Sequence, residues 1–167
     1  MKERFSPKNI AKTALILTVT LILSYVENLI PWSFSVPGVK IGLANIGIVF
    51  ALYRLGAAEG AVISLLRVAI ISVLFGTGLS FLYALSGAVF SYGLMLLLKK
   101  LKFALPTVSV CGGVAHNLAQ VLTAMLLLSL KELVLYLPVL IASGIVAGLI
   151  IGILSAILVK RIPENII

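Results

Sequence analysis

An apolar run from about Leu105 to Leu130 carries three strongly polar side chains near its middle, and this feature constrains the whole fold. At ~1.5 Å per residue, the run is long enough to cross a bilayer as a helix. Polar groups at that depth are costly unless they face a protein interior or a wet cavity. His116 and Gln120 share one helix face because they are four residues apart, and Asn117 lies on its flank. The run therefore predicts one wall of a binding site inside a membrane bundle.

Composition places the chain among integral membrane proteins. Its 167 residues are 62% hydrophobic and 11% charged, whereas about a quarter of the residues in a soluble domain are charged. At ~20 apolar residues per span, there is room for six helices and for no soluble domain. We predict an all-α membrane protein with a single six-helix transmembrane domain over residues 1–167. The helices are expected at about 9–30, 41–55, 57–75, 79–98, 106–130 and 136–159.

The distribution of basic residues predicts how the helices cross the bilayer. With the N-terminus in the cytoplasm, ten of the thirteen basic residues lie on the cytoplasmic side, and Lys40 and Lys131 lie outside. Such an excess of Lys and Arg is typical of cytoplasmic loops. Both termini are therefore expected in the cytoplasm, and the net charge of +8 indicates topology rather than nucleic-acid binding. The predicted location is a prokaryotic plasma membrane, which the chain crosses several times.

Polar and charged residues gather in the outer half of the predicted bundle. The topology places residues of four helices and one loop at that depth, and the inner half has no comparable set. We predict that these residues bind a small-molecule substrate. The predicted substrate-binding residues are Glu27, Lys40, Asn45, Arg67, His116, Asn117 and Gln120.

Arg67 needs a partner, because a charge at mid-membrane costs ~2.5–3.5 kcal/mol on insertion scales. One interpretation is an internal ion pair with Glu27, the acid in the outer half of a span. The other is that Arg67 and Lys40 hold an anionic group of a ligand, since a guanidinium fork suits phosphate or carboxylate. Both hold if the ligand displaces Glu27, so the sequence leaves the choice open.

The residue types that the sequence lacks argue against an enzyme. It contains no aspartate, whereas a magnesium site for diphosphate chemistry needs carboxylates. It has no Gly-Lys-Ser/Thr phosphate loop for ATP hydrolysis, and no serine or cysteine with a plausible base and orienting acid. His116 has no second histidine and no nearby thiolate or carboxylate on its own helix to share a metal. We therefore expect neither catalysis nor a metal or other cofactor.

Small residues repeat at intervals of four in the last predicted helix, at Gly144, Gly148, Gly152 and Ala156. Such a strip lets another helix approach closely. It is compatible with packing inside the bundle and with a surface for a partner membrane subunit.

Two motifs surround the predicted site, PGVKIGLAN at residues 37–45 and GVAHNLAQ at residues 113–120. They resemble the Gx transporter family, often labelled heptaprenyl diphosphate synthase component I, over nearly the whole chain. The resemblance implies a substrate-binding S component of an energy-coupling factor (ECF) transporter. Such a subunit has six helices and an outward-facing site under the loop between the first two. It docks on a transmembrane coupling subunit that works with two cytoplasmic ATPase subunits.

Two functional hypotheses follow. The first is an S component that captures a small anionic or polar nutrient, with an isoprenoid or quinone precursor among the candidates. The alternative is a non-catalytic membrane scaffold associated with polyprenyl diphosphate synthesis. A ligand-dependent rise in thermal stability favours the first hypothesis, and co-purification with a soluble prenyl synthase favours the second.

Overall fold

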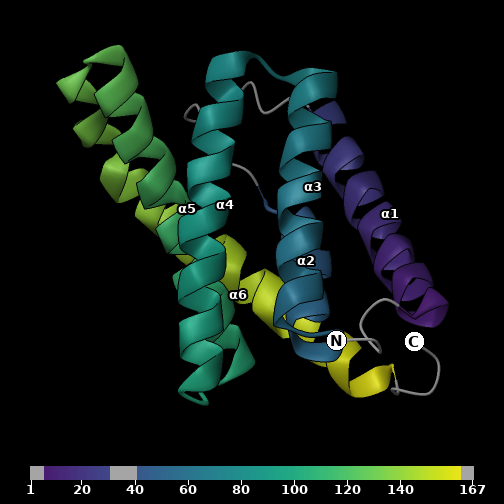
Figure 1. Cartoon of the computed structure of the whole chain (residues 1–167). Coiled ribbons are helices and arrows are strands. Elements are labelled where there is room, and N and C mark those ends of the chain that lie inside the picture. Colours follow the sequence, from purple (N-terminus) through teal and green to yellow (C-terminus); the bar gives the residue numbers. More distant parts are fainter. Residues whose placement is uncertain (1–5, 31–40, 163–167) are drawn as a thin grey trace.

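The structure is a computed structural model that describes residues 6–30 and 41–162. These residues form six α-helices and one short 3₁₀ helix, η1 (Figure 1). The predicted fold class, an all-α membrane protein with six helices, is confirmed. The elements are α1 (Pro7–Leu29), α2 (Ala44–Arg54), α3 (Ala57–Phe75), α4 (Gly78–Lys100), α5 (Leu105–Leu128), η1 (Lys131–Tyr136) and α6 (Leu137–Arg161).

Within the described residues, five helical segments are long and apolar enough to cross a membrane, namely α1, α3, α4, α5 and the continuous stretch of η1 and α6. The chain is therefore a multi-pass membrane protein. In contrast, α2 has 11 residues, which at 1.5 Å per residue span about 16 Å, roughly half of the hydrocarbon core. It begins at Ala44 rather than at residue 41, because Gly42 has a left-handed backbone (φ 78°) that does not continue a helix.

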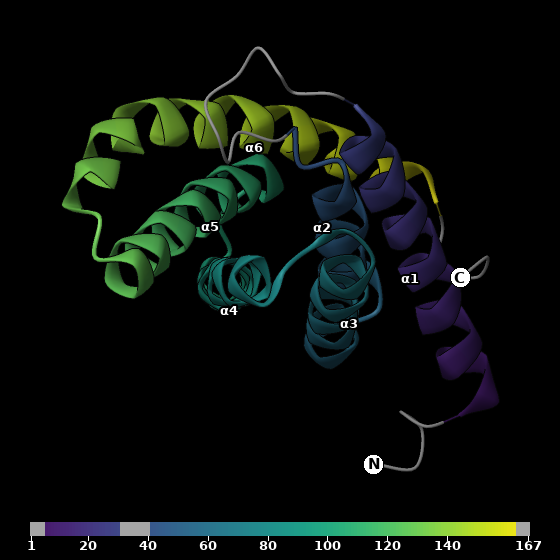
Figure 2. The ribbon, with the colours of Figure 1, turned by 90° about the horizontal axis from the view of Figure 1, so that it is seen from above.

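The helices form two groups joined by α6. In the view from above, α1, α2 and α3 lie on one side and α4 and α5 on the other, while α6 runs behind both groups (Figure 2). α6 contacts α5 in one group and α2 in the other. The start of α1 and the end of α6 lie at the same end of the bundle (Figure 1). Which side of the membrane this end faces stays a prediction.

The short helix α2 is the most buried element. Ala44, Ala51 and Leu52 have no exposed surface, and Val49 is 1% exposed. α1 lies close against it, because a Cβ added at Gly47 would stand 2.1 Å from the Thr20 hydroxyl oxygen. α1, α3 and α6 all contact α2. The central position of α2 means that residues at its N-terminal end lie inside the bundle.

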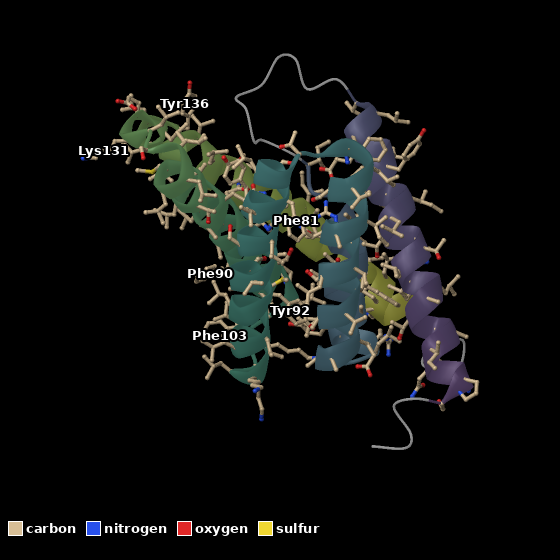
Figure 3. The ribbon with its side chains drawn as sticks, turned by 45° about the horizontal axis from the view of Figure 1, so that its top comes forward. Phe81, Phe90, Tyr92, Phe103, Lys131 and Tyr136 are labelled. Atoms are coloured by element: carbon tan, nitrogen blue, oxygen red, sulfur yellow. The ribbon has the colours of Figure 1, made fainter. Side chains whose placement is uncertain are left out.

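The outward faces of the long helices are apolar. On α4, Phe90 is 67% exposed and points away from the bundle, while Tyr92 points inward (Figure 3). Large exposed apolar side chains also cover α1, α5 and α6. In a protein with spans of this length, such a surface faces lipid.

The strip of small residues on α6 packs inside the bundle. Gly144, Gly148 and Gly152 are buried, and a Cβ added at Gly148 would lie 2.6 Å from Val110 Cα of α5. A Cβ added at Gly152 would lie 2.7 Å from Pro106 Cα. Internal packing, one of the two interpretations of the strip, therefore accounts for these three glycines.

At the end of the bundle where α6 stops, basic side chains tie the helices together. Arg54 at the end of α2 donates from Nη2 to the carbonyl oxygens of Val159 and Ile162, the latter at 2.6 Å. The Lys99 ammonium donates to the Leu52 carbonyl and lies 4.8 Å from the centre of the Tyr53 ring. These bonds satisfy carbonyls that the ends of α2 and α6 leave without helical partners.

We predict that Gly148→Ala lowers the stability of the protein. The added methyl group would meet the backbone of α5, and overpacking of this kind costs typically 1–3 kcal/mol. Thermal unfolding of the chain in lipid nanodiscs should show a lower midpoint than wild type. Gly93→Ala on α4 is the matched control, because nothing lies within 4 Å of its added Cβ. An equal change in both variants would contradict close packing of α5 and α6.

Candidate binding site

One cavity of about 540 Å³ lies between the helices and is lined by residues of all six helices and of η1. Six of the seven predicted substrate-binding residues line it. The seventh, Lys40, lies outside the described residues, as does the loop expected above the site. The role of all seven residues and of this loop in substrate binding stays a prediction. The six residues are Glu27, Asn45, Arg67, His116, Asn117 and Gln120.

Glu27 connects the end of α1 to the start of α2. Its side chain is 1% exposed, and Oε1 accepts a hydrogen bond from the backbone N–H of Gly42. The N-terminus of a helix carries a partial positive charge that favours a nearby carboxylate. This contact gives Glu27 a structural role at the wall of the cavity.

Arg67 of α3 is held by its inner nitrogen. Nε donates to the Ser24 hydroxyl oxygen at 3.0 Å, and Ser24 donates in turn to the Thr20 carbonyl at 2.9 Å. The two terminal nitrogens, Nη1 and Nη2, form no hydrogen bond or ion pair with any residue that the structure describes. Glu27 acts on Arg67 electrostatically without a direct ion pair. Because Arg67 lines the cavity, its guanidinium fork is available to a ligand.

Two uncharged amides also line the cavity without internal partners. The side chains of Asn45 on α2 and Gln120 on α5 form no hydrogen bond with the described part of the chain. A carboxamide offers two N–H donors and one acceptor oxygen. Both side chains are half-buried, so their amide groups can bond to water or a ligand.

His116 and Gln120 lie against α4 at Gly87. A Cβ added at Gly87 would come within 2.8 Å of the His116 ring and 2.9 Å of Gln120 Cγ. Gly87 therefore leaves the room in which both side chains sit. His116 also interacts with other groups, so its ring is held in place at the wall of the cavity.

Asn117 joins α5 to α6. Its Nδ2 donates to the Leu140 carbonyl at 2.7 Å and to the Ser143 hydroxyl at 3.3 Å. Both amide hydrogens are therefore engaged in packing. Only Oδ1 is left to face the cavity, which distinguishes Asn117 from its neighbour Gln120.

The chain matches the family model described as heptaprenyl diphosphate synthase component I over residues 16–158. It belongs to this family. The match includes all seven predicted substrate-binding residues, from Glu27 to Gln120. The comparison with curated proteins gave no match, and neither did the comparison with solved structures. Family membership thus rests on the sequence match, and the site rests on the geometry above.

The sequence analysis missed the residues that position the site. Ser24 holds Arg67, Ser143 accepts from Asn117, and Gly87 makes room for His116. Tyr83 was not among the predicted binding residues. Its hydroxyl is buried beside the cavity and has no hydrogen-bond partner among the described residues. One signal was present for Ser24, because Thr20, Ser24 and Glu27 follow helical spacing and mark a polar face on α1.

Residues 6–30 and 41–162 contain no group of three His, Cys, Asp or Glu side chains placed to hold a metal ion. The chemistry available at the cavity is therefore hydrogen bonding and charge. It comes from one guanidinium, one carboxylate, one imidazole, four carboxamides, two phenols and four serine hydroxyls.

We predict that Asn117→Leu and Gln120→Leu have different effects. Asn117→Leu removes the hydrogen bonds to α6, and interhelical bonds in membranes contribute about 0.6–1.7 kcal/mol. Its thermal midpoint in nanodiscs should fall. Gln120→Leu removes no internal hydrogen bond and should leave the midpoint of the ligand-free protein near wild type. A larger loss for Gln120→Leu would contradict this division of roles.

Proposed function

We propose that this protein is the substrate-binding S component of an ECF-type uptake transporter. In this role the cavity captures a small anionic or polar nutrient from the outer side of the membrane. An isoprenoid or quinone precursor fits this description. The observation that carries the proposal is the state of Arg67, which is fixed through Nε and has both Nη groups unbonded within the described residues.

The cavity supports this proposal by its size and lining. A volume of about 540 Å³ lies within the 300–1,000 Å³ typical of small-molecule sites. Most of its lining is apolar, with a few converging polar groups. A charged side chain inside a membrane bundle is expensive and marks a functional site in many membrane proteins. Binding of an anion would offset the free-energy cost of placing the Arg67 charge inside the bundle.

The proposed partners follow from the transport role. The sequence lacks an ATP-binding phosphate loop, so an S component must be energised by other subunits. These are a transmembrane coupling subunit and two cytoplasmic ATPase subunits. We assign no catalytic step to this chain, because its sequence has no aspartate for a magnesium–diphosphate site.

A second candidate function comes from the family description. A name that specifies component I of a synthase implies a partner subunit in a synthase complex. In this role the chain would be a non-catalytic scaffold that recruits a soluble prenyl synthase to the membrane. The cavity would then hold lipid or water, and Arg67 would serve structure alone.

We predict that the gently purified protein retains a small compound and that Arg67→Gln loses it. The measurement is native mass spectrometry of the full chain, followed by extraction and identification of what is bound. Hydrogen bonds to charged groups contribute about 1.5–3 kcal/mol, so binding should weaken at least tenfold. Arg161→Gln is the matched control, because this exposed arginine lies at the end of α6, away from the cavity.

The scaffold role gives a different result. Wild type would release only phospholipid, a soluble synthase would co-purify with it, and Arg67→Gln would change neither observation. These three observations together would overturn the transport proposal.

A further inference from the structure

The polar groups of the cavity belong to two opposed walls. α2 and α3 stand on one side of the space and α4 and α5 on the other, while α6 runs past both pairs (Figure 2). Arg67 and Asn45 are on the first wall, and Gln120 of α5 and Tyr83 of α4 are on the second. Apolar side chains such as Val68, Ile71, Val121, Leu140 and Ile151 also line the cavity.

The two walls differ in charge. Among the described lining residues, the charged side chains are Glu27 and Arg67, and both come from the α1–α3 group. Glu27 accepts from the Gly42 N–H, whereas the Nη groups of Arg67 have no partner in the described chain. This wall therefore presents a positive fork, the geometry that binds a carboxylate or phosphate oxygen pair.

The α4–α5 wall presents uncharged groups. The Tyr83 hydroxyl is buried with no hydrogen-bond partner in the described residues, and the Gln120 amide makes no internal hydrogen bond there. A phenol and a carboxamide together can donate and accept. A buried hydroxyl left without a hydrogen bond is costly, so a ligand group that bonds to Tyr83 is favoured here, and the half-buried Gln120 amide offers a second bond.

The volume limits the size of the ligand. About 540 Å³ lies within the range of roughly 300–1,000 Å³ found for small-molecule sites. This is room for a compound of vitamin size. A full heptaprenyl chain with its diphosphate is larger and carries more negative charge than one guanidinium balances.

We propose that the cavity recognises an amphipathic monoanion with two hydrogen-bonding ends, an anionic group bound by Arg67 and an uncharged hydroxyl or carbonyl group bound by Tyr83 and Gln120, joined by an apolar body. This inference rests on the proposed function and specifies its substrate class. Gly87 is a positioning residue for the uncharged end, because it makes room for Gln120 and His116.

Three naphthalene probes test the two ends separately. 6-Hydroxy-2-naphthoate has both ends, 2-naphthoate lacks the hydroxyl, and 2,6-dihydroxynaphthalene lacks the anion. Affinities are measured for the full chain in nanodiscs from the shift of the thermal midpoint with probe concentration. The hydroxynaphthoate should bind at least tenfold more tightly than either of the other two.

The variants should remove one end each. Arg67→Gln should abolish the advantage over the dihydroxy compound, and Gln120→Leu should abolish the advantage over 2-naphthoate. Gly87→Ala should act like Gln120→Leu by displacing that side chain, while Gly93→Ala on the same helix should bind like wild type. The probe-free midpoints show which variants remain folded.

Equal affinity for the three probes, or no binding of any of them, would overturn the two-ended assignment. Tighter binding of farnesyl diphosphate than of hydroxynaphthoate would also overturn it, in favour of a longer polyanion. A small compound released from the purified protein would leave the proposed function standing in each case. Release of phospholipid alone, with a synthase co-purifying, would instead mark failure of the proposed function itself.

Discussion

The structure depends on the interactions that let the short helix α2 begin inside the helix bundle. α2 has 11 residues and cannot cross alone, so backbone at Ile41–Leu43 is non-helical inside the bundle. Lipid cannot satisfy such backbone, which is tolerated where protein or a wet cavity surrounds it. The Glu27 carboxylate accepts from the Gly42 N–H, and the cavity takes in Ile41, Gly42 and Asn45. The short helix α2 and the cavity therefore both follow from the need to keep this non-helical backbone away from lipid.

The packing of α5 on α6 makes that solution possible. Glycines on both helices bring their backbones together, so α6 can run behind both helix groups. Asn117 adds hydrogen bonds to this contact. Close packing on one side of α5 leaves its other polar residues, His116 and Gln120, to face α4 and the cavity. α5 therefore packs tightly on α6 with one face and lines the cavity with another.

The sequence predicts the long helices well, because ~20-residue apolar runs and polar interruptions are local signals. It also predicts six of the polar residues that line the cavity. It does not predict the start of α2, because the left-handed Gly42 donates its N–H to the Glu27 carboxylate fifteen residues away, a contact that no local pattern reveals. Nor does it separate Asn117, whose amide is bonded to α6, from Gln120, whose amide is not. That difference arises from the rotation of α5 against its neighbours, which sequence spacing alone leaves undetermined.

The hydrogen bonds between the two helix groups have a mechanical consequence. Several hydrogen bonds that join α1–α3 to α4–α6 lie at one end, where Tyr92 donates to the Ala57 carbonyl, Lys99 to the Leu52 carbonyl, and Arg54 to carbonyls at the end of α6. At the opposite end, α3 and α4 are linked by the Gly76–Thr77 connection. Loss of the Arg54 or Lys99 side chain would therefore loosen the contact between the two helix groups without removing a residue that lines the cavity.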